Sequence, residues 1–212
     1  MIAPPERSAE RDAALEATLP HVPFDGWSLT ALRRGLAASG ADPRDAALLF
    51  PGGAADLIAA FCDLADRRMT AAMDAAEYAG LRTTARVRAA IALRLEQNRP
   101  HREAVRRALG VLALPGHAGV AAGCTARSVD AIWQAAGDRS ADFSWYTKRA
   151  ILAGVYAATL LFWLSPEGED PEAVLAFLDR RLAGVGRIGM LRRRAGERLR
   201  GLVPAGMRAR PA

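Results

Sequence analysis

The 212-residue sequence is poor in several residue types, and each shortage excludes a class of structure or chemistry. Val, Ile, Thr and Tyr are too sparse and scattered to mark several strands. Cys62 and Cys124 form no C-x-x-C pair, and with three histidines in all nothing has the spacing of metal ligands. No Ser/His/Asp set, activated cysteine or phosphate-binding loop is visible, so the sequence does not predict an enzyme or a bound cofactor.

The sequence also gives no signal for a targeting leader or for a membrane-spanning helix. The opening residues MIAPPERSAERD contain neither an apolar stretch with a cleavage site nor an Arg/Ser-rich amphipathic leader. The uncharged run over residues 150–164 has fifteen residues, fewer than the roughly 17–25 that a spanning helix needs. We therefore predict that this run is a helix buried among others in the core. A sharper version of this prediction, that the helix lines an apolar cavity, is one that periodicity alone cannot show. The two thiols are expected to be reduced and buried in a cytoplasmic compartment.

Ala, Leu, Arg and Glu are abundant, and all four favour helices. Val87, Ile91 and Leu95 recur at the four-residue spacing of one helix face. Ser28 is a favourable N-cap, and Asp-Pro pairs at 42–43 and 170–171 are typical of helix starts. We predict an all-α fold with helices over residues 7–19, 29–38, 42–49, 54–79, 118–135, 144–164 and 170–182, and with a break at 21–26.

The order of the first helices resembles the N-terminal domain of TetR-type repressors over about residues 7–65. Two short helices, 29–38 and 42–49, are separated by a Gly-containing turn, as in a helix-turn-helix. A DNA-reading helix needs donors for bases and phosphates, yet residues 43–49 offer one Arg, one Asp and then apolar side chains. The sequence therefore predicts the architecture without nucleic-acid binding, and a TetR-like regulator with an apolar ligand cavity remains the alternative.

The positive charge is concentrated at the C-terminal end. Residues 180–212 contain ten Arg and one acidic residue, a net charge of +9 against +6 for the whole chain, so residues 1–179 sum to −3. As a helix, this segment has an apolar stripe opposite an Arg-rich face, a pattern typical of a helix that lies on an anionic membrane. The alternatives are a solvated surface helix and a nucleic-acid-binding tail. The predicted membrane-contact residues are Ile188, Leu191, Arg193, Arg194, Leu199 and Leu202.

A run from Trp133 to Ala150 carries the most specific pattern. It reads W-Q-A-A-G-D-R-S-A-D-F-S-W-Y-T-K-R-A, and a helix core needs neither the adjacent Trp-Tyr pair nor the Gly-Asp turn before it. The run resembles the signature W-x-x-x-G-D-x-S-x-D-x-N-W-Y-T-x-R of the lipid-binding accessory family of coenzyme Q biosynthesis, the ninth Coq protein family. It departs at Ser144, where the family has Asn; Ser is also a helix cap.

Three further segments resemble the same family in the same order along the chain. They are FDGWS at 24–28, FPGG at 50–53 and FLDRR at 177–181. Together they extend the resemblance over most of the chain. The division that we predict is a helix-turn-helix-like subdomain over residues 1–80, a helical lipid-binding core over 81–183 and a basic amphipathic segment over 184–212.

The family resemblance implies a TetR-like fold that holds an isoprenoid quinone precursor, or another lipid, and presents it to a ubiquinone-pathway hydroxylase without catalysing a reaction. The family's partner-binding patch falls on Trp145, Tyr146 and Arg149, residue types that are enriched at interface hot spots. A homodimer is expected by analogy with TetR proteins, and the expected location is the bacterial cytoplasm, peripheral on the inner membrane. Within the uncharged run, the candidate lipid-lining residues are Ile151, Leu152, Val155, Tyr156, Leu160, Phe162 and Trp163.

Overall fold

The computed structural model describes residues 5–137 and 144–184, and this part of the chain is helical with no strand. Residues 171–184 form a further helix after the last 3₁₀ turn. The α-helices are α1 (Ala9–Thr18), α2 (Val22–Asp25), α3 (Leu29–Ala38), α4 (Ala46–Leu49), α5 (Gly53–Ala72), α6 (Ala76–Ala79), α7 (Thr83–Gln97), α8 (Arg102–Leu112), α9 (Ala118–Ala135) and α10 (Ser144–Trp163). The all-α prediction is confirmed.

Local capping chemistry explains where the predicted helices begin. The Ser28 hydroxyl accepts a hydrogen bond from the Ala31 N–H at 3.2 Å, which caps α3. Asp42 accepts from the Arg44 N–H at 2.9 Å and opens a 3₁₀ turn that leads into α4. The observed bounds of α3 and α9 match the predicted ranges 29–38 and 118–135.

Two predicted boundaries were wrong. The long helix expected over residues 54–79 ends at Ala72, and a short α6 follows after Ala75 takes an extended conformation. The guanidinium of Arg86 donates to the carbonyl oxygens of Tyr78 and Ala135, so a contact with the end of α9 stabilises this break. The segment 21–26, expected to be a simple break, contains α2 and ends at Gly26 with φ +67°.

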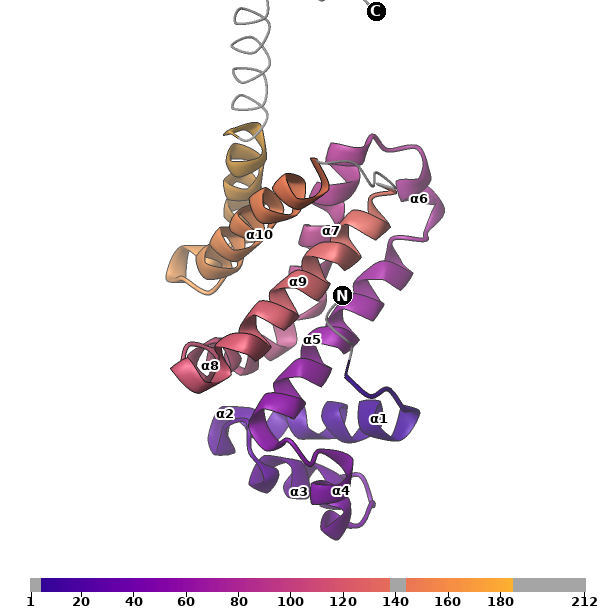
Figure 1. Ribbon diagram of the computed structural model, residues 1–212, viewed down its shortest axis with the longest axis vertical. Coiled ribbons are helices and arrows are strands. Elements are labelled where there is room, and N and C mark those ends of the chain that lie inside the picture. The colour runs from indigo at the N-terminus through magenta and orange to yellow at the C-terminus, as the bar shows by residue number, and fades with distance from the viewer. Residues whose placement is uncertain (1–4, 138–143, 185–212) are drawn as a thin grey trace, which may run out of the picture.

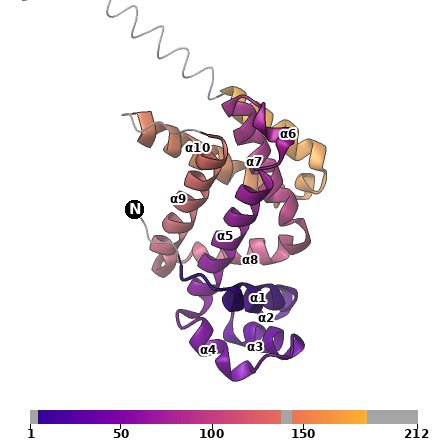
Figure 2. The same ribbon diagram turned by 90° about the vertical axis from the view of Figure 1, so that its right-hand side faces the viewer.

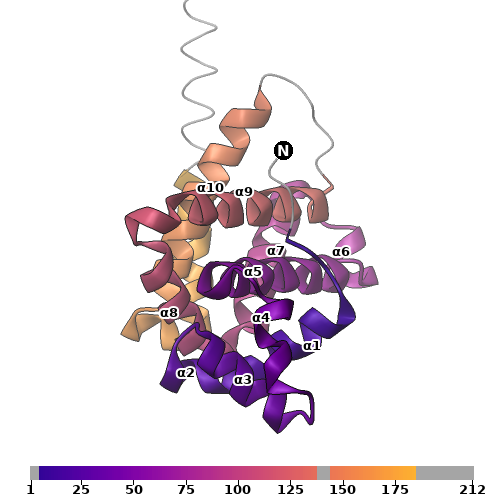
Figure 3. The same cartoon turned by 60° about the horizontal axis from the view of Figure 1, so that its bottom comes forward.

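The helices form two regions (Figures 1 and 2). Helices α1–α4 gather at one end of α5, while α7, α8 and α9 pack along its remainder and α10 lies against α9 and α7. Figure 3 shows α5 and α9 side by side, and these two helices share the most extensive packing in the described chain. The Trp27 indole N–H donates to the Ala104 carbonyl on α8 at 2.9 Å, which connects the two regions. The predicted division at residues 80 and 183 remains a prediction.

Candidate functional site

The candidate lipid-lining residues all lie on α10, but they do not share one environment. Leu152, Val155, Tyr156 and Trp163 are buried, and Leu160 and Phe162 are half-buried. Ile151 is 37% exposed, so it lies at the surface of this helix rather than in the core. The structure therefore brings only part of the predicted set together.

An inner chamber of about 50 Å³ lies between α5, α7, α8 and α10. Of the predicted residues, Tyr156, Leu160 and Trp163 line it. Sequence reasoning missed the polar part of its wall, which comes from helices distant in sequence. The polar lining residues are Cys62, Arg94 and Asn98.

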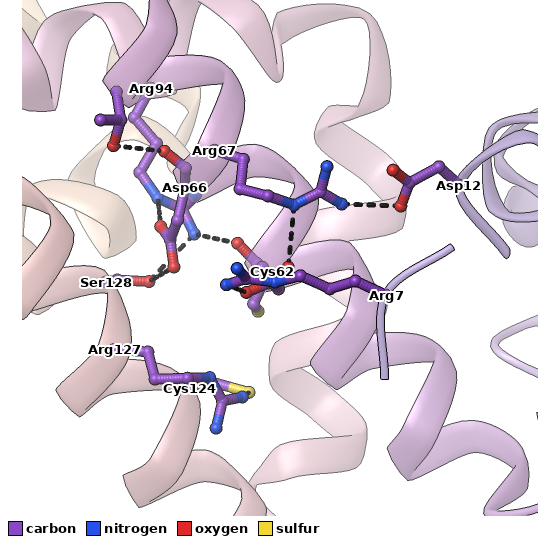
Figure 4. A network of polar contacts seen from close by, with 11 residues as sticks. Arg7, Asp12, Cys62, Asp66, Arg67, Arg94, Cys124, Arg127 and Ser128 are labelled. Atoms are coloured by element: carbon purple, nitrogen blue, oxygen red, sulfur yellow. Dashed lines mark hydrogen bonds and ion pairs between the residues drawn. The ribbon is translucent and has the colours of Figure 1, made fainter. Parts of the chain in front are cut away.

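Arg94 belongs to a buried ionic network behind this chamber (Figure 4). Its Nε donates to Asp66 Oδ1 at 2.7 Å, and one terminal nitrogen donates to the Ser128 hydroxyl at 3.1 Å. Ser128 in turn donates to Asp66 Oδ2 at 2.9 Å. Burial opposes the charge of Arg94, but the Asp66 carboxylate outweighs it and raises the pKa of Arg94, so this guanidinium stays protonated. Three helices, α5, α7 and α9, are thereby held around one buried charge pair.

The two cysteines are neighbours despite their separation in sequence. Both thiols are free, and the Cys62 thiol hydrogen-bonds to the Cys124 sulfur across the α5–α9 interface. This contact, together with burial, raises the pKa of Cys62 well above its usual value, while the same contact lowers the pKa of Cys124 to about 7. An Arg127 guanidinium nitrogen lies 3.4 Å from the Cys124 sulfur. The sequence pattern C-x-x-C could not reveal this pair, because that pattern detects only cysteines that are close together in the sequence.

A second space lies on the outer side of the same wall, between α7 and the helix over residues 171–184. This outer groove has a volume of about 340 Å³. Its apolar lining residues are Ala89, Ala92, Leu93, Leu95, Trp163, Pro171, Val174, Leu175 and Leu178. Trp163 is the only residue of the predicted lipid-lining set that the groove and the inner chamber share.

The predicted partner-binding patch lies near the start of α10. Tyr146 is 77% exposed. Arg149 is half-buried, and its Nε donates to the Asp130 carboxylate on α9, so its guanidinium is oriented by an ion pair. The backbone of Trp145 is helical, but its side chain lies outside the described part of the structure. A groove of about 410 Å³ between α9 and α10 begins beside Arg149 and is lined mainly by Ala122, Ala126, Val129, Ala150 and Ala153.

Three of the sequence motifs have clear structural roles. Trp27 and Phe50 are buried, and the Arg11 guanidinium lies 4.2 Å from the centre of the Phe50 ring. The Phe177 ring stacks on Phe162 with 4.3 Å between ring centres, and Asp179 pairs with Arg88 at 2.5 Å. The 177–181 motif therefore holds its helix against α10 and α7, and the other two motifs contribute buried rings at the other end of the bundle. Phe24 is an exception, because it is 82% exposed.

The remaining predictions concern membrane and metal chemistry. No single described helix has the length and apolar composition of a membrane span; two sharply bent helix pairs meet these criteria only jointly. Within the described ranges no group of His, Cys, Asp or Glu could hold a metal ion. The predicted membrane-contact residues Ile188, Leu191, Arg193, Arg194, Leu199 and Leu202 lie outside the described residues, as does the turn over 138–143.

Comparison with known proteins identifies relatives of this chain. The sequence profile of the COQ9 family matches residues 118–189. The ubiquinone biosynthesis protein COQ9 (mitochondrial) of Rattus norvegicus is 33% identical over 175 residues, covering 79% of this chain and 56% of that protein. The corresponding protein of Schizosaccharomyces pombe is 31% identical over 175 residues, covering 82% of this chain and 69% of that protein. The chain spans little more than half the length of several of these curated relatives.

Among solved structures, a TetR transcriptional regulator from Nitrosomonas europaea has the same fold. The two superpose with a TM-score of 0.67 at 22% sequence identity, over 83% of this chain and 97% of the regulator. The prediction of a TetR-like helical bundle is confirmed. At this identity the similarity establishes the fold alone.

Proposed function

Because the chain belongs to the COQ9 family of ubiquinone biosynthesis proteins, we propose that it is a non-catalytic accessory protein that binds an isoprenoid quinone precursor and presents it to a pathway hydroxylase. The observation that carries this proposal is the layout of α10. The exposed Tyr146 and the ion-paired Arg149 lie near its start, and Tyr156 and Trp163 line the chamber farther along. One rigid helix thus connects a surface for a protein partner with the wall of an apolar cavity.

Lipid binding is tested first by native mass spectrometry. The purified chain is incubated with a lipid extract from ubiquinone-producing bacteria and sprayed without denaturation. We expect a bound species whose released mass is that of an isoprenoid phenol or quinone. Recovery of the chain with no such lipid, under conditions where a known lipid carrier retains its own, would argue against the proposal.

The partner surface is tested with the hydroxylase that uses the carried precursor. Tyr146→Ala is expected to weaken capture of that hydroxylase at least about tenfold, as for an aromatic hot-spot residue. Trp145→Ala should act in the same direction. Leu161→Ala is the matched control, because Leu161 is also large, 62% exposed and on α10. Equal capture by Tyr146→Ala and Leu161→Ala would remove Tyr146 from the interface.

The membrane surface is tested separately, because it depends on the basic C-terminal segment. We propose that residues 184–212 hold the protein at an anionic bilayer, on the cytoplasmic face of a bacterial inner membrane. Deletion of residues 188–212 should reduce co-sedimentation with vesicles that contain phosphatidylglycerol, and should leave the weak binding to phosphatidylcholine vesicles unchanged. Undiminished binding to the anionic vesicles would contradict this part of the proposal.

A DNA-binding regulator is the second candidate, and the likeness to the Nitrosomonas europaea regulator favours it. The corresponding surface is poorly suited to DNA. Helix α4 has only four residues, Leu48 on it is 80% exposed, and the Arg44 guanidinium is paired with Asp42 at 2.9 Å. A specific shift of the gene's own upstream DNA in an electrophoretic assay at about 0.15 M salt would favour the regulator.

A further inference from the structure

Two apolar spaces in this protein share a dividing wall. The inner chamber lies between α5, α7, α8 and α10, and the outer groove lies between α7 and the helix over residues 171–184. Leu95 on α7 and Trp163 at the end of α10 line both. These two buried side chains therefore separate the interior of the bundle from an opening on its surface.

The backbone at Trp163 is fixed while its ring forms the wall. The Arg102 guanidinium donates to the Trp163 carbonyl oxygen at 3.0 and 2.8 Å and lies 5.8 Å from the centre of the indole ring. The chain then turns through residues 166–169 into the helix that forms the far side of the groove. A rotation of the Trp163 side chain would thus connect the two spaces without moving α10.

Tyr156 is one of the polar residues that line the inner chamber. Tyr156 is 7% exposed and lines the chamber, and its hydroxyl makes no hydrogen bond to any other residue that the structure describes. Burial raises the pKa of Tyr156 to about 12, so the phenol is neutral at physiological pH and can donate a proton in a hydrogen bond. The Arg94 guanidinium, by contrast, is already held by Asp66 and Ser128. The Tyr156 hydroxyl therefore suits a neutral oxygen acceptor.

The inner chamber alone is too small for an aromatic ring, and the outer groove alone is small for a ring with a prenyl tail. The chamber has about 50 Å³, whereas a cavity that holds benzene has roughly 150 Å³. The outer groove has about 340 Å³, near the lower end of the range of ligand pockets. A ring whose tail lies in the groove would reach Tyr156 only if the two spaces form one continuous site.

We propose that the outer groove is the entrance to the lipid site and that the Trp163 ring is its gate, which opens to let the oxygen-bearing ring of the lipid reach Tyr156 while the tail lies in the groove. This inference rests on the proposed function and adds the direction of entry and the residue that recognises the ring. The occupant is a neutral quinone or phenol with an apolar chain.

The rim of the groove argues for this occupant over a charged ligand or a peptide. Arg88 is paired with Asp179 at 2.5 Å, and Arg99 is paired with Glu96 at 2.8 Å. The charges at the rim are therefore balanced locally and attract no ion. The floor consists of small and aliphatic residues, and its continuity with the chamber through Trp163 fits a narrow chain better than a folded segment.

The entrance is tested with decylubiquinone, whose binding is followed by quenching of tryptophan fluorescence and by calorimetry. Ala92→Trp fills the outer groove, and we expect the affinity to fall at least about tenfold because the tail loses its contact surface. Ala122→Trp is the matched control, since it places the same side chain in the separate groove between α9 and α10. That variant should bind like the wild type.

The gate and the ring contact are tested independently. Leu95→Ala and Trp163→Ala thin the wall, and association of decylubiquinone should become about tenfold faster because no closed state must open first. Two variants are used so that loss of folding in one leaves the other. Tyr156→Phe removes only the hydroxyl and should weaken decylubiquinone roughly fivefold, with no change for decylbenzene, which lacks an acceptor.

The outcomes separate this inference from the proposed function. If the wild type binds decylubiquinone but Ala92→Trp has no effect while Ala122→Trp blocks binding, the lipid function stands and the entrance is at α9–α10. Unchanged association rates in both wall variants would remove the gate. If the wild type binds neither decylubiquinone nor an extracted isoprenoid lipid, both the proposed function and the gate are overturned.

Discussion

The two ends of this helical bundle are held together by different physical means. Between α1 and α5 ion pairs supplement the apolar core: Arg residues on either helix or just before α1 pair with carboxylates on the other side. Between α7, α10 and the helix over residues 171–184, the contacts are mainly apolar, apart from the Arg88–Asp179 ion pair, and they border the chamber and the groove. The ion pairs of the α1–α5 contact are Arg7–Asp63, Arg11–Asp56, Arg67–Asp12 and Arg68–Glu16.

This difference matters because ion pairs and apolar contacts constrain the helices that they join in different ways. Ion pairs have directional geometry and leave little room for rearrangement, so they suit a base that keeps one shape. Apolar contacts lack direction, and a wall made of them can open for a ligand at modest cost. The ion pairs supplement the packing of the helix-turn-helix-like end, and the space proposed for a ligand lies where the lining is mainly apolar.

The largest expected effect comes from the polar exception inside the apolar end. Arg94→Ala removes the only hydrogen-bonded counter-ion that the described residues offer Asp66, whose side chain is 8% exposed. A buried carboxylate without its partner costs roughly 3–5 kcal/mol. Urea unfolding should show this loss, while replacing both partners by Met and Leu should restore most of the stability. A loss below about 1 kcal/mol for Arg94→Ala would mean that water reaches Asp66.

The next effect tests the close packing of the ionic end. A Cβ at Gly35 on α3 would lie 2.5 Å from the Ala17 carbonyl oxygen on α1, too close for a non-bonded carbon–oxygen contact. Gly35→Ala should therefore destabilise the protein by about 2 kcal/mol through separation of α1 and α3. Gly110→Ala on α8 is the matched control, because its Cβ meets nothing within 4 Å. We expect that variant to be unchanged or slightly more stable.

A smaller effect tests the ion pairs themselves. Burial favours the protonated form of Asp63, but hydrogen bonds from Arg7 and Arg67 outweigh it and lower the pKa of this carboxyl below its usual 3.8. Its contribution to stability is therefore present above pH 3.8 and is lost as the pH falls through the lower folded-state pKa. Because Arg7 is half exposed, solvent screens the pair, and Asp63→Asn should cost about 1 kcal/mol at pH 7.

The measurement for Asp63 is the difference in unfolding free energy between wild type and Asp63→Asn as a function of pH. That difference should be constant from pH 7 to about pH 5 and should vanish in strong acid. Asp42→Asn is the matched control, because the Asp42–Arg44 ion pair is exposed and joins residues only two positions apart in the sequence. A difference that persists in strong acid would show that charge is not its source.

The smallest expected effect concerns α4 at the tip of the ionic end. Leu48 is 80% exposed, so Leu48→Ser should change the free energy of unfolding by no more than about 0.5 kcal/mol. Thermal unfolding at two protein concentrations measures this. A larger loss that grows with concentration would show that α4 is buried in an assembly, and would place the expected homodimer contact at this end.

Local signals in the sequence predicted much of this fold. Ser28 and the Asp42–Pro43 pair mark helix starts because a side-chain oxygen next to free N–H groups caps a helix regardless of its surroundings. The end of α5 at Ala72 carried no such signal, because Arg86 stabilises the break from another helix. The buried Arg94 had one clue, since it follows Ile91 by three residues and so lies on the apolar stripe of α7.

The candidate site was predictable only in part. Periodicity placed Tyr156 and Trp163 on a buried helix, but it could not distinguish a residue that lines a space from one that packs against a neighbour. Ile151 and Leu152 are adjacent and equally apolar, yet only Leu152 is buried. Cys62 and Cys124 show the same limit, because helices far apart in sequence brought their sulfurs together.

By itself, the sequence determined the helical class, most helix starts, the family and the uneven distribution of charge. These properties depend on backbone capping, on periodicity and on residue identity, all of which act within a few positions along the chain. Only the tertiary structure decided where the groove and the chamber lie, that Trp163 divides them, and that Arg94 is neutralised by Asp66. Packing between helices that are distant in the sequence sets these features, because a cavity is the space that the side chains of those helices leave unfilled.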